Sequence, residues 1–159
     1  MIEEQKKSGR PRKYDAEYFP HFCNHNRTLE IIVDKYGNEG YAFFYRLQEL
    51  LGRTPSQGYD AYSDLKYEYL LSKTGVDHEK ADEIITLLCD FGEIDAMMWN
   101  DEKLIWWQNF VDSLKVLYKK RKNELPTKID FFKKVMLEKG PNQHPEIHKV
   151  KESKANNTR

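Results

Sequence analysis

The sequence has few cysteines and no long apolar run. Its 159 residues include two cysteines, Cys23 and Cys89, which is too few for the disulfide framework of a small secreted protein. No apolar stretch approaches the ~20 residues that a membrane-spanning helix needs, and the polar first residues do not resemble a signal peptide. We therefore expect a soluble protein with reduced thiols, a cytoplasmic location and no membrane partner.

The sequence also lacks the short motifs that mark common enzyme classes. It contains no phosphate-binding Gly-x-x-x-x-Gly-Lys, no Gly-x-Ser-x-Gly and no His-Glu-x-x-His. Carboxylates are abundant, but most fall where helix surfaces need solvation. We expect no catalytic activity and no cofactor.

One group of residues has the types, but not the number, needed for a metal site. His21, Cys23 and His25 alternate along the chain, so an extended strand would place all three side chains on one face. A structural zinc site usually needs four ligands, and the sequence contains no matching second half. The favoured interpretation is a loop near the core, and we expect no metal site.

The net charge is zero, but the charges are unevenly distributed. Residues 1–13 hold five basic and two acidic side chains, residues 14–114 hold eight and nineteen, and residues 115–159 hold thirteen and five. The pattern is an acidic body with two basic ends. Each end could neutralise phosphates. The alternative is that the ends are solvated tails that keep the domain soluble.

The basic N-terminal segment is the first candidate contact with nucleic acid. Gly9-Arg10-Pro11 is the core of an AT-hook-like arm, in which arginines enter the narrow minor groove of A·T-rich DNA. Sequence-independent phosphate contact and a plain solubilising tail are the alternatives. The candidate DNA-binding residues here are Lys6, Lys7, Arg10, Arg12 and Lys13.

Capping residues predict the helices of the body. Asn24 or Asn26 starts a helix that Gly37 ends, and a second helix covers residues 39–51. Ser63 or Asp64 starts a helix that Gly75 ends, and Asp77 caps another that Gly92 ends. Residues 59–62 are compatible with one short strand. We divide the chain into a flexible basic arm (1–13), a body (14–123), a C-terminal amphipathic helix (124–140) and a disordered polar tail (141–159).

Two apolar runs after these helices predict a β-hairpin. They cover residues 93–99 and 103–106, and Asn100-Asp101-Glu102 between them favours a turn. Helix, short strand, two helices and a hairpin is the order of a winged helix-turn-helix. The predicted fold is therefore mainly α, with a small hairpin wing and extra flanking helices. We expect Trp99, Trp106 and Trp107 to be buried under this hairpin or in an interface. The alternative is that they stack on unpaired bases.

Residues 107–122 have the spacing of one amphipathic helix with a basic C-terminal end. Its cations could follow a nucleic-acid backbone or could simply be a solvated helical face. Its apolar stripe is larger than a small domain buries alone, which allows a homo-oligomer.

The helix in the recognition position, residues 79–91, has a mostly anionic exposed side that phosphates would repel. The basic end of residues 107–122 is therefore the second candidate contact with nucleic acid. The candidate DNA-binding residues of the basic end are Lys115, Lys119, Lys120, Arg121 and Lys122.

A last helix follows Thr127, with Asp130 in a box-like cap. Its apolar residues at helical spacing, which we expect to form the buried stripe, are Ile129, Phe132, Val135 and Met136.

An ordered set of short segments resembles a known family. The segments are Arg10-Pro11-Arg12-Lys13, Tyr18-Phe19-Pro20, Lys35-Tyr36-Gly37-Asn38-Glu39-Gly40-Tyr41, Gly58-Tyr59 and Trp106-Trp107. Together they resemble the N-terminal domain of phage and mobile-element replication initiators, the replisome-organiser proteins related to DnaD-like primosome proteins. The resemblance covers roughly residues 9–115. It implies a winged-helix-like module that binds DNA or builds a nucleoprotein assembly at an origin, and it brings no catalytic residues.

The sequence thus predicts a DNA-binding, replication-initiation protein of the replisome-organiser type. Its expected partners are DNA and replisome proteins such as a helicase or loader. The alternative is a non-catalytic transcriptional or assembly adaptor, whose acidic body binds proteins and whose basic ends are incidental.

Overall fold

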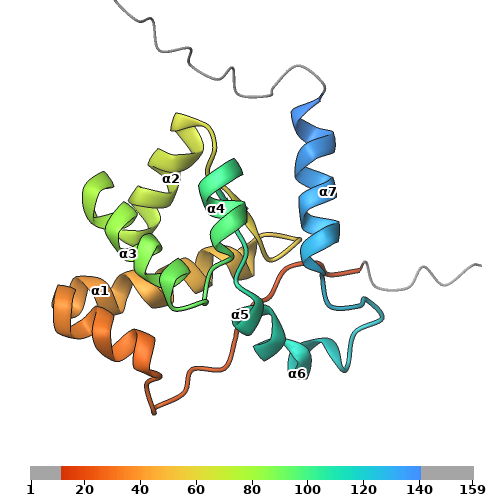
Figure 1. Cartoon of the computed structure of the whole chain (residues 1–159). Helices are drawn as coiled ribbons and strands as arrows, with labels where there is room; N and C mark the ends of the chain where they lie inside the picture. Colours follow the sequence, from red (N-terminus) through yellow and green to blue (C-terminus); the bar gives the residue numbers. More distant parts are fainter. Residues whose placement is uncertain (1–11, 141–159) are drawn as a thin grey trace, which may run out of the picture.

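The computed structural model describes residues 12–140. These residues are mainly helical, with seven helices and one two-stranded antiparallel sheet (Figure 1). The predicted tail and most of the predicted arm, including Lys6, Lys7 and Arg10, lie outside the described residues. In chain order, the elements are α1 (Arg27–Arg53), β1 (Tyr59–Asp60), α2 (Asp64–Thr74), α3 (His78–Asp90), α4 (Ala96–Glu102), β2 (Leu104–Ile105), α5 (Gln108–Ser113), α6 (Lys115–Tyr118) and α7 (Lys128–Lys139).

The first helix is kinked where the sequence predicted a break. Gly37 has φ 60° and ψ −141°, which are not helical angles and which favour glycine. The N-cap is Asn26, whose side chain accepts a hydrogen bond from the Leu29 amide. Beyond the kink the backbone is tightly packed, because a Cβ on Gly40 would lie 2.8 Å from Ile32 Cγ2. The two predicted helices are therefore confirmed as two arms of α1.

The helical pair α2 and α3 begins and ends at the predicted residues. Ser63 accepts from the Lys66 amide at the start of α2, and Gly75 closes that helix in the left-handed conformation. Asp77 then accepts from the Lys80 amide at the start of α3. Local capping chemistry was sufficient to predict both helices.

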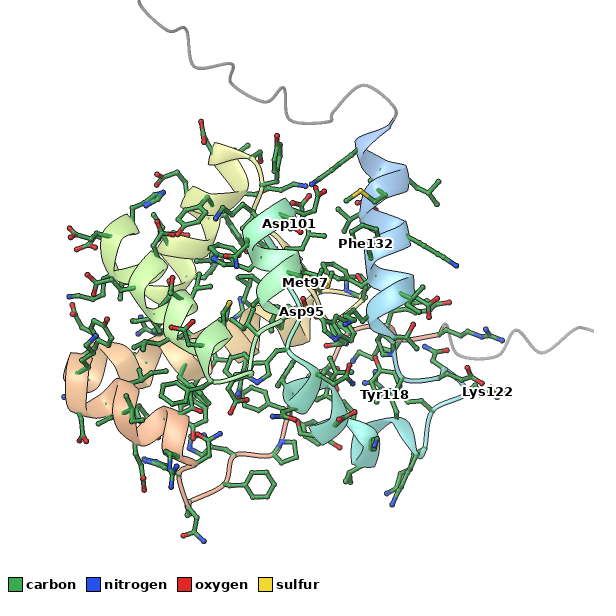
Figure 2. All side chains as sticks on the ribbon, in the orientation of Figure 1. Asp95, Met97, Asp101, Tyr118, Lys122 and Phe132 are labelled. Carbon is green, nitrogen blue, oxygen red and sulfur yellow. The ribbon has the colours of Figure 1, made fainter. Side chains whose placement is uncertain are left out.

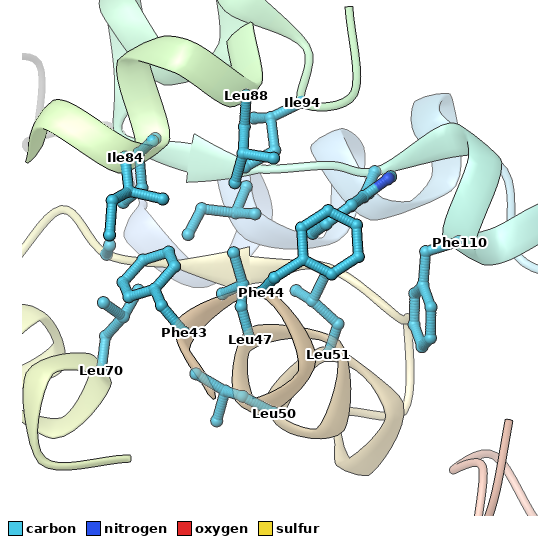
Figure 3. Packing of buried hydrophobic residues seen from close by; sticks show 14 of the residues in the cluster. Phe43, Phe44, Leu47, Leu50, Leu51, Leu70, Ile84, Leu88, Ile94 and Phe110 are labelled. Atoms are coloured by element: carbon cyan, nitrogen blue, oxygen red, sulfur yellow. The ribbon is translucent and has the colours of Figure 1, made fainter. Parts of the chain in front are cut away.

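The main core lies between the second arm of α1 and α3. Figure 3 shows Phe43, Phe44 and Leu47 of α1 directed toward Ile84 and Leu88 of α3. Four of these five side chains are fully buried, and Phe44 is 5% exposed. At about 1.5–3 kcal/mol for each large apolar side chain removed from water, this contact is a major stabilising feature of the fold.

The predicted β-hairpin is wrong. Residues 96–102 form α4, capped by Asp95, and only Leu104–Ile105 is a strand. That strand pairs with β1, so Ile105 lies opposite Tyr59 rather than opposite a neighbouring run. The apolar residues of a seven-residue helix also fit a strand pattern. A partner far away in the chain decided which structure forms.

The predicted single helix over residues 107–122 is also wrong. The chain breaks at Leu114, which has φ −80° and ψ −2°, into the short helices α5 and α6. Leu114 is fully buried, and Phe110, Val111 and Tyr118 are buried with it. The apolar stripe that allowed an oligomer is therefore largely covered by the chain itself.

The last helix follows its predicted cap but buries a different face. Thr127 accepts from the Asp130 amide and donates its hydroxyl to the Asp130 carboxylate, as the box-like cap predicted. Phe131 is buried, whereas Ile129 and Phe132 are 62% and 38% exposed. The predicted stripe is correct at Val135, which is buried, and at Met136, which packs against the second core. It is wrong at Ile129 and Phe132, because the fold presents Trp106 and Gly58 to the Phe131 side of the helix.

α7 packs on the body through a second, smaller core (Figure 1). The rings of Trp106 and Phe131 stack with centroids 5.8 Å apart. Trp99 and Trp107 are buried in the main core, so all three tryptophans are core residues. The buried members of the second core are Met98, Leu104, Trp106, Val111, Phe131 and Val135. Among the described residues, no helix combines the length and the apolar character that a bilayer crossing requires.

Candidate nucleic-acid interface

The N-terminal segment is joined to the chain after α6 by side chains that donate to its backbone carbonyls. Arg121 Nη1 donates to the carbonyl oxygen of Asp15 at 2.7 Å and lies 3.4 Å from that of Lys13. Asn123 Nδ2 donates to the Lys13 oxygen at 2.6 Å. We call this contact between residues 13–15 and residues 121–123 the terminal seam.

A buried glutamine fixes the middle of the terminal seam. Gln57 Nε2 donates to the Tyr14 oxygen at 3.1 Å and lies 3.2 Å from the Tyr118 hydroxyl, which donates to the same Tyr14 oxygen. Gln57 is fully buried and has a φ of 58° in the loop between α1 and β1. The amide of Ala16 also donates to the Gly52 carbonyl at 2.7 Å. The seam is therefore part of the folded body.

The terminal seam brings the described end of the N-terminal basic region, Arg12 and Lys13, next to the basic residues after α6 at one edge of the molecule. Arg12 and Lys122 line the same groove, whose volume is about 630 Å³, and Lys134 of α7 lines it as well. Tyr14, 53% exposed, adds an aromatic side chain to this groove. Figure 2 places Tyr118 and Lys122 below α7, where the N-terminal segment passes.

Acidic side chains also line this groove. Glu124 and Asp130 are both exposed at its margin. The Asp130 carboxylate accepts a hydrogen bond from the Thr127 hydroxyl in the cap of α7, so one of its oxygens already has a partner within the protein. The groove is therefore cationic with an acidic border, which would restrict where a phosphate can lie.

The predicted DNA-binding residues fall into two groups. Arg12, Lys115, Lys119, Lys120 and Lys122 are exposed. Lys119, Lys120 and Lys122 take part in no ion pair within residues 12–140. Lys115 lies 3.8 Å from Asp112, an exposed pair of the kind that contributes little.

Arg121 and Lys13 are placed differently from the exposed cations. Arg121 is half-buried, its guanidinium lies 5.0 Å from the centre of the Tyr118 ring, and it donates to the seam carbonyls. Lys13 pairs with Glu17. Arg121 therefore acts first as a connector that positions the N-terminal segment.

The recognition-position helix α3 carries the opposite charge. Glu83 on α3 accepts a hydrogen bond from the Tyr36 hydroxyl of α1 at 2.8 Å. Burial, followed by the bond and charge of Glu83, raises the pKa of Tyr36 to about 12. Lys80 pairs with Glu39 across the same two helices. These contacts hold α3 against α1, and most of the charged side chains that α3 exposes to solvent are carboxylates.

His21, Cys23 and His25, for which the sequence favoured a loop over a metal site, precede α1, and the rings of His21 and His25 both lie beside that of Tyr41, at 6.4 and 5.7 Å. His21 stacks on Tyr45 with ring centroids 3.9 Å apart, and its Nε2 lies 3.2 Å from the Tyr41 hydroxyl. No group of three or more histidine, cysteine or acidic residues in the described part of the chain is arranged to hold a metal ion.

Sequence reasoning missed Gln57, Tyr118 and Asn123. Each donates a hydrogen bond to a backbone carbonyl of the N-terminal segment, more than 40 residues away in the sequence. The one local signal was Gln57 itself, a polar residue before a glycine in a loop. Comparisons with protein-family models, with curated proteins and with solved structures found no match to this chain.

Proposed function

We propose that this protein binds nucleic acid through the basic edge that the terminal seam assembles. The observation that supports the proposal is the meeting of both basic regions at this seam, since Arg12 and Lys122 line one groove. The basic edge comprises Arg12, Lys13, Lys115, Lys119, Lys120 and Lys122. Clustered exposed lysines attract the phosphate backbone and release its counterions on binding.

The basic edge, rather than α3, is the proposed contact surface. Phosphates would be repelled by the carboxylates around Glu83, and they would be attracted by Lys119, Lys120 and Lys122. In this proposal α2 and α3 are a helix-turn-helix-like pair that serves as scaffold, and β1–β2 takes the place of the wing. The winged-helix assignment is part of the proposal.

A role in replication initiation is a further part of the proposal. It rests on the resemblance of residues 9–115 to replisome-organiser proteins, because a fold alone does not define a function. In that role the basic edge would hold origin DNA, while the acidic surface of α1 and α3 would be free to contact a helicase or loader.

Mobility shifts at two salt concentrations test the binding step. With single- and double-stranded probes, we expect a complex at low ionic strength whose affinity falls steeply as salt rises. A probe that is not shifted at about 50 mM salt would contradict the proposal. Equal affinity at ~50 and ~200 mM salt would also contradict it, because phosphate contacts cannot be salt-independent.

An adaptor without nucleic-acid binding is the second candidate. The observation in its favour is the anionic surface of α3, where Glu83 and Glu79 face away from the core. An adaptor predicts no shifted probe at any salt concentration and co-purification with a basic protein partner. The mobility-shift experiment therefore separates the two candidates.

A further inference from the structure

A small pocket lies at the opposite end of the N-terminal segment from the terminal seam. Its volume is about 190 Å³, and it is bounded by residues 20–26, by the second arm of α1 and by the start of α5. This volume is below the ~300 Å³ of sites for drug-sized ligands, so only a small head group fits.

The pocket contains a buried carboxylate. Glu93 is 8% exposed, and it accepts hydrogen bonds from Asn26 Nδ2 at 2.9 Å, Trp107 Nε1 at 2.9 Å and Asn109 Nδ2 at 3.2 Å. All three donors are neutral, and no lysine or arginine lines the pocket. Asn26 caps the N-terminus of α1, where the helix dipole helps to stabilise the anion. The pocket therefore carries one buried carboxylate, and the single basic side chain in its lining is the imidazole of His25.

The amide of Gln48 is available to a ligand. Gln48 is 9% exposed and lines the pocket, yet it makes no side-chain hydrogen bond within the described residues. The amide atoms of Gln48 are not among the buried side-chain atoms that lack a partner, so they are open to solvent inside the pocket. A polar group of a ligand would take the place of the water that solvates this amide.

The apolar lining of the pocket is aromatic, and its inner rings pack edge to face against one another. The ring of Phe44 is 4.9 Å from that of Trp107 at 87°, and 5.3 Å from that of Tyr45 at 73°. Phe110 also lines the pocket, and Phe22 lies at its rim with 67% exposure. Aromatic rings attract organic ammonium ions, and among the lining rings Phe22 offers a ligand the most exposed surface.

From these observations we infer that the Glu93 pocket binds an organic ammonium ion, either quaternary or primary. The carboxylate supplies the countercharge, the aromatic lining contacts the alkyl groups, and Gln48 bonds a polar substituent. A quaternary ion needs no acceptor, whereas a primary ammonium would donate to Glu93 Oε1, which accepts one hydrogen bond and has a second lone pair free. The inference does not depend on nucleic-acid binding.

The Trp107 indole N–H is a direct reporter, because it donates to Glu93. In a titration followed by ¹H–¹⁵N correlation spectra, we expect choline to shift this signal with a Kd in the range of ~1 mM or tighter. The indole N–H of Trp106, which donates to Gln108 at 3.0 Å, is the internal control and should move little. Butylammonium as a second probe shows whether a primary ammonium binds more tightly.

The neutral isostere 3,3-dimethylbutan-1-ol separates charge recognition from apolar filling. We expect it to bind at least ~10-fold more weakly than choline, since it lacks the cation. Equal affinity for the two, or no shift of the Trp107 signal with either ammonium probe, would overturn the inference.

Two variants test the assigned residues. Glu93→Gln should abolish the preference for choline over its isostere, and a retained preference would overturn the role of Glu93. Phe22→Ala removes an exposed ring and should fold normally while weakening choline binding several-fold. Phe132→Ala, which removes an exposed ring on α7, is the matched control and should leave the affinity unchanged.

Discussion

Arg121 Nη1 donates a hydrogen bond to the backbone carbonyl of Asp15 at 2.7 Å, across 106 residues of sequence. This bond joins the segment before α1 to the segment after α6. A basic residue that the sequence assigned to DNA contact thus has a structural role, and the cations beside it occupy a fixed position on the body.

Replacement of Arg121 should weaken the terminal seam. Arg121→Ala removes the donor to Asp15 and the contact with Tyr118, and we expect a loss of about 1–2 kcal/mol in the free energy of unfolding in urea. Lys120→Ala is the matched control, because Lys120 is exposed and should change stability by less than about 0.5 kcal/mol. Equal stability of the two variants would show that the seam contributes nothing.

Removal of exposed cations at the basic edge should change the salt dependence of nucleic-acid binding. For Lys120→Ala combined with Lys122→Ala, we expect the slope of log K against log salt for duplex DNA to fall by about 2, at ~0.9 per phosphate contact. The matched control combines Lys35→Ala with Lys73→Ala, two lysines on α1 and α2. An equal decrease in both double variants would place binding elsewhere.

Gly58 is expected to be intolerant of a side chain. A Cβ at this position would lie 2.7 Å from the Phe131 ring. Gly58→Ala should therefore destabilise the protein by about 1–3 kcal/mol, the usual range for overpacking. Combined with Phe131→Leu, which removes the ring, the alanine should cost less than it does alone. Strictly additive effects in a thermal unfolding series would show that the two residues are not in conflict.

Acid should weaken the attachment of α7 through Asp95. Burial alone would raise the pKa of Asp95, but hydrogen bonds from the Met98 amide and from Lys128, at 2.9 Å, hold that pKa below its ordinary value of 3.8. A carboxylate with a lowered folded-state pKa adds stability that is present above 3.8 and is lost as the pH falls through the folded-state value.

The variant Asp95→Asn isolates this charge, because asparagine still caps α4. Its stability deficit against the unsubstituted protein should be full near neutral pH and should shrink below about pH 4. Unfolding curves measured at a series of pH values check this expectation. A deficit that stays constant through the acid range would contradict it.

The two cysteines should differ in their rates of thiol modification. Burial, followed by the charges of Asp90 and Asp95, raises the pKa of Cys89 to about 11. Thiolate is the reactive form, so about one Cys89 thiol in 10³ is reactive at pH 8. Cys23 is exposed. With a disulfide reagent, we expect one fast and one slow phase, and Cys23→Ser should remove the fast phase. Two equal rates would show that Cys89 is accessible.

Much of the fold could be predicted because its signals are local. Asn26, Ser63, Asp77 and Thr127 each start a helix by accepting a hydrogen bond from the amide three residues ahead. Gly37 ends a helical arm because it adopts a φ that other residues avoid. Each rule needs only a few consecutive residues, so no tertiary partner had to be known.

The elements that were wrongly predicted depend on partners distant in the chain. Residues 93–106 do not form a hairpin, because the partner of Ile105 is Tyr59 of β1, which lies 46 residues earlier in the sequence. The buried face of α7 was decided in the same way, by Trp106 stacking on Phe131. Apolar spacing in a short element fits more than one face or period, so packing makes the choice.

The candidate sites divide along the same line. The sequence by itself determined the helix caps, the acidic body and the presence of two basic regions. Only the tertiary structure decided that these regions meet at the terminal seam and that Glu93 lies among aromatic rings. The physical reason is that charge and capping belong to individual residues, whereas a groove, a buried carboxylate and a shared edge exist only when distant segments pack together.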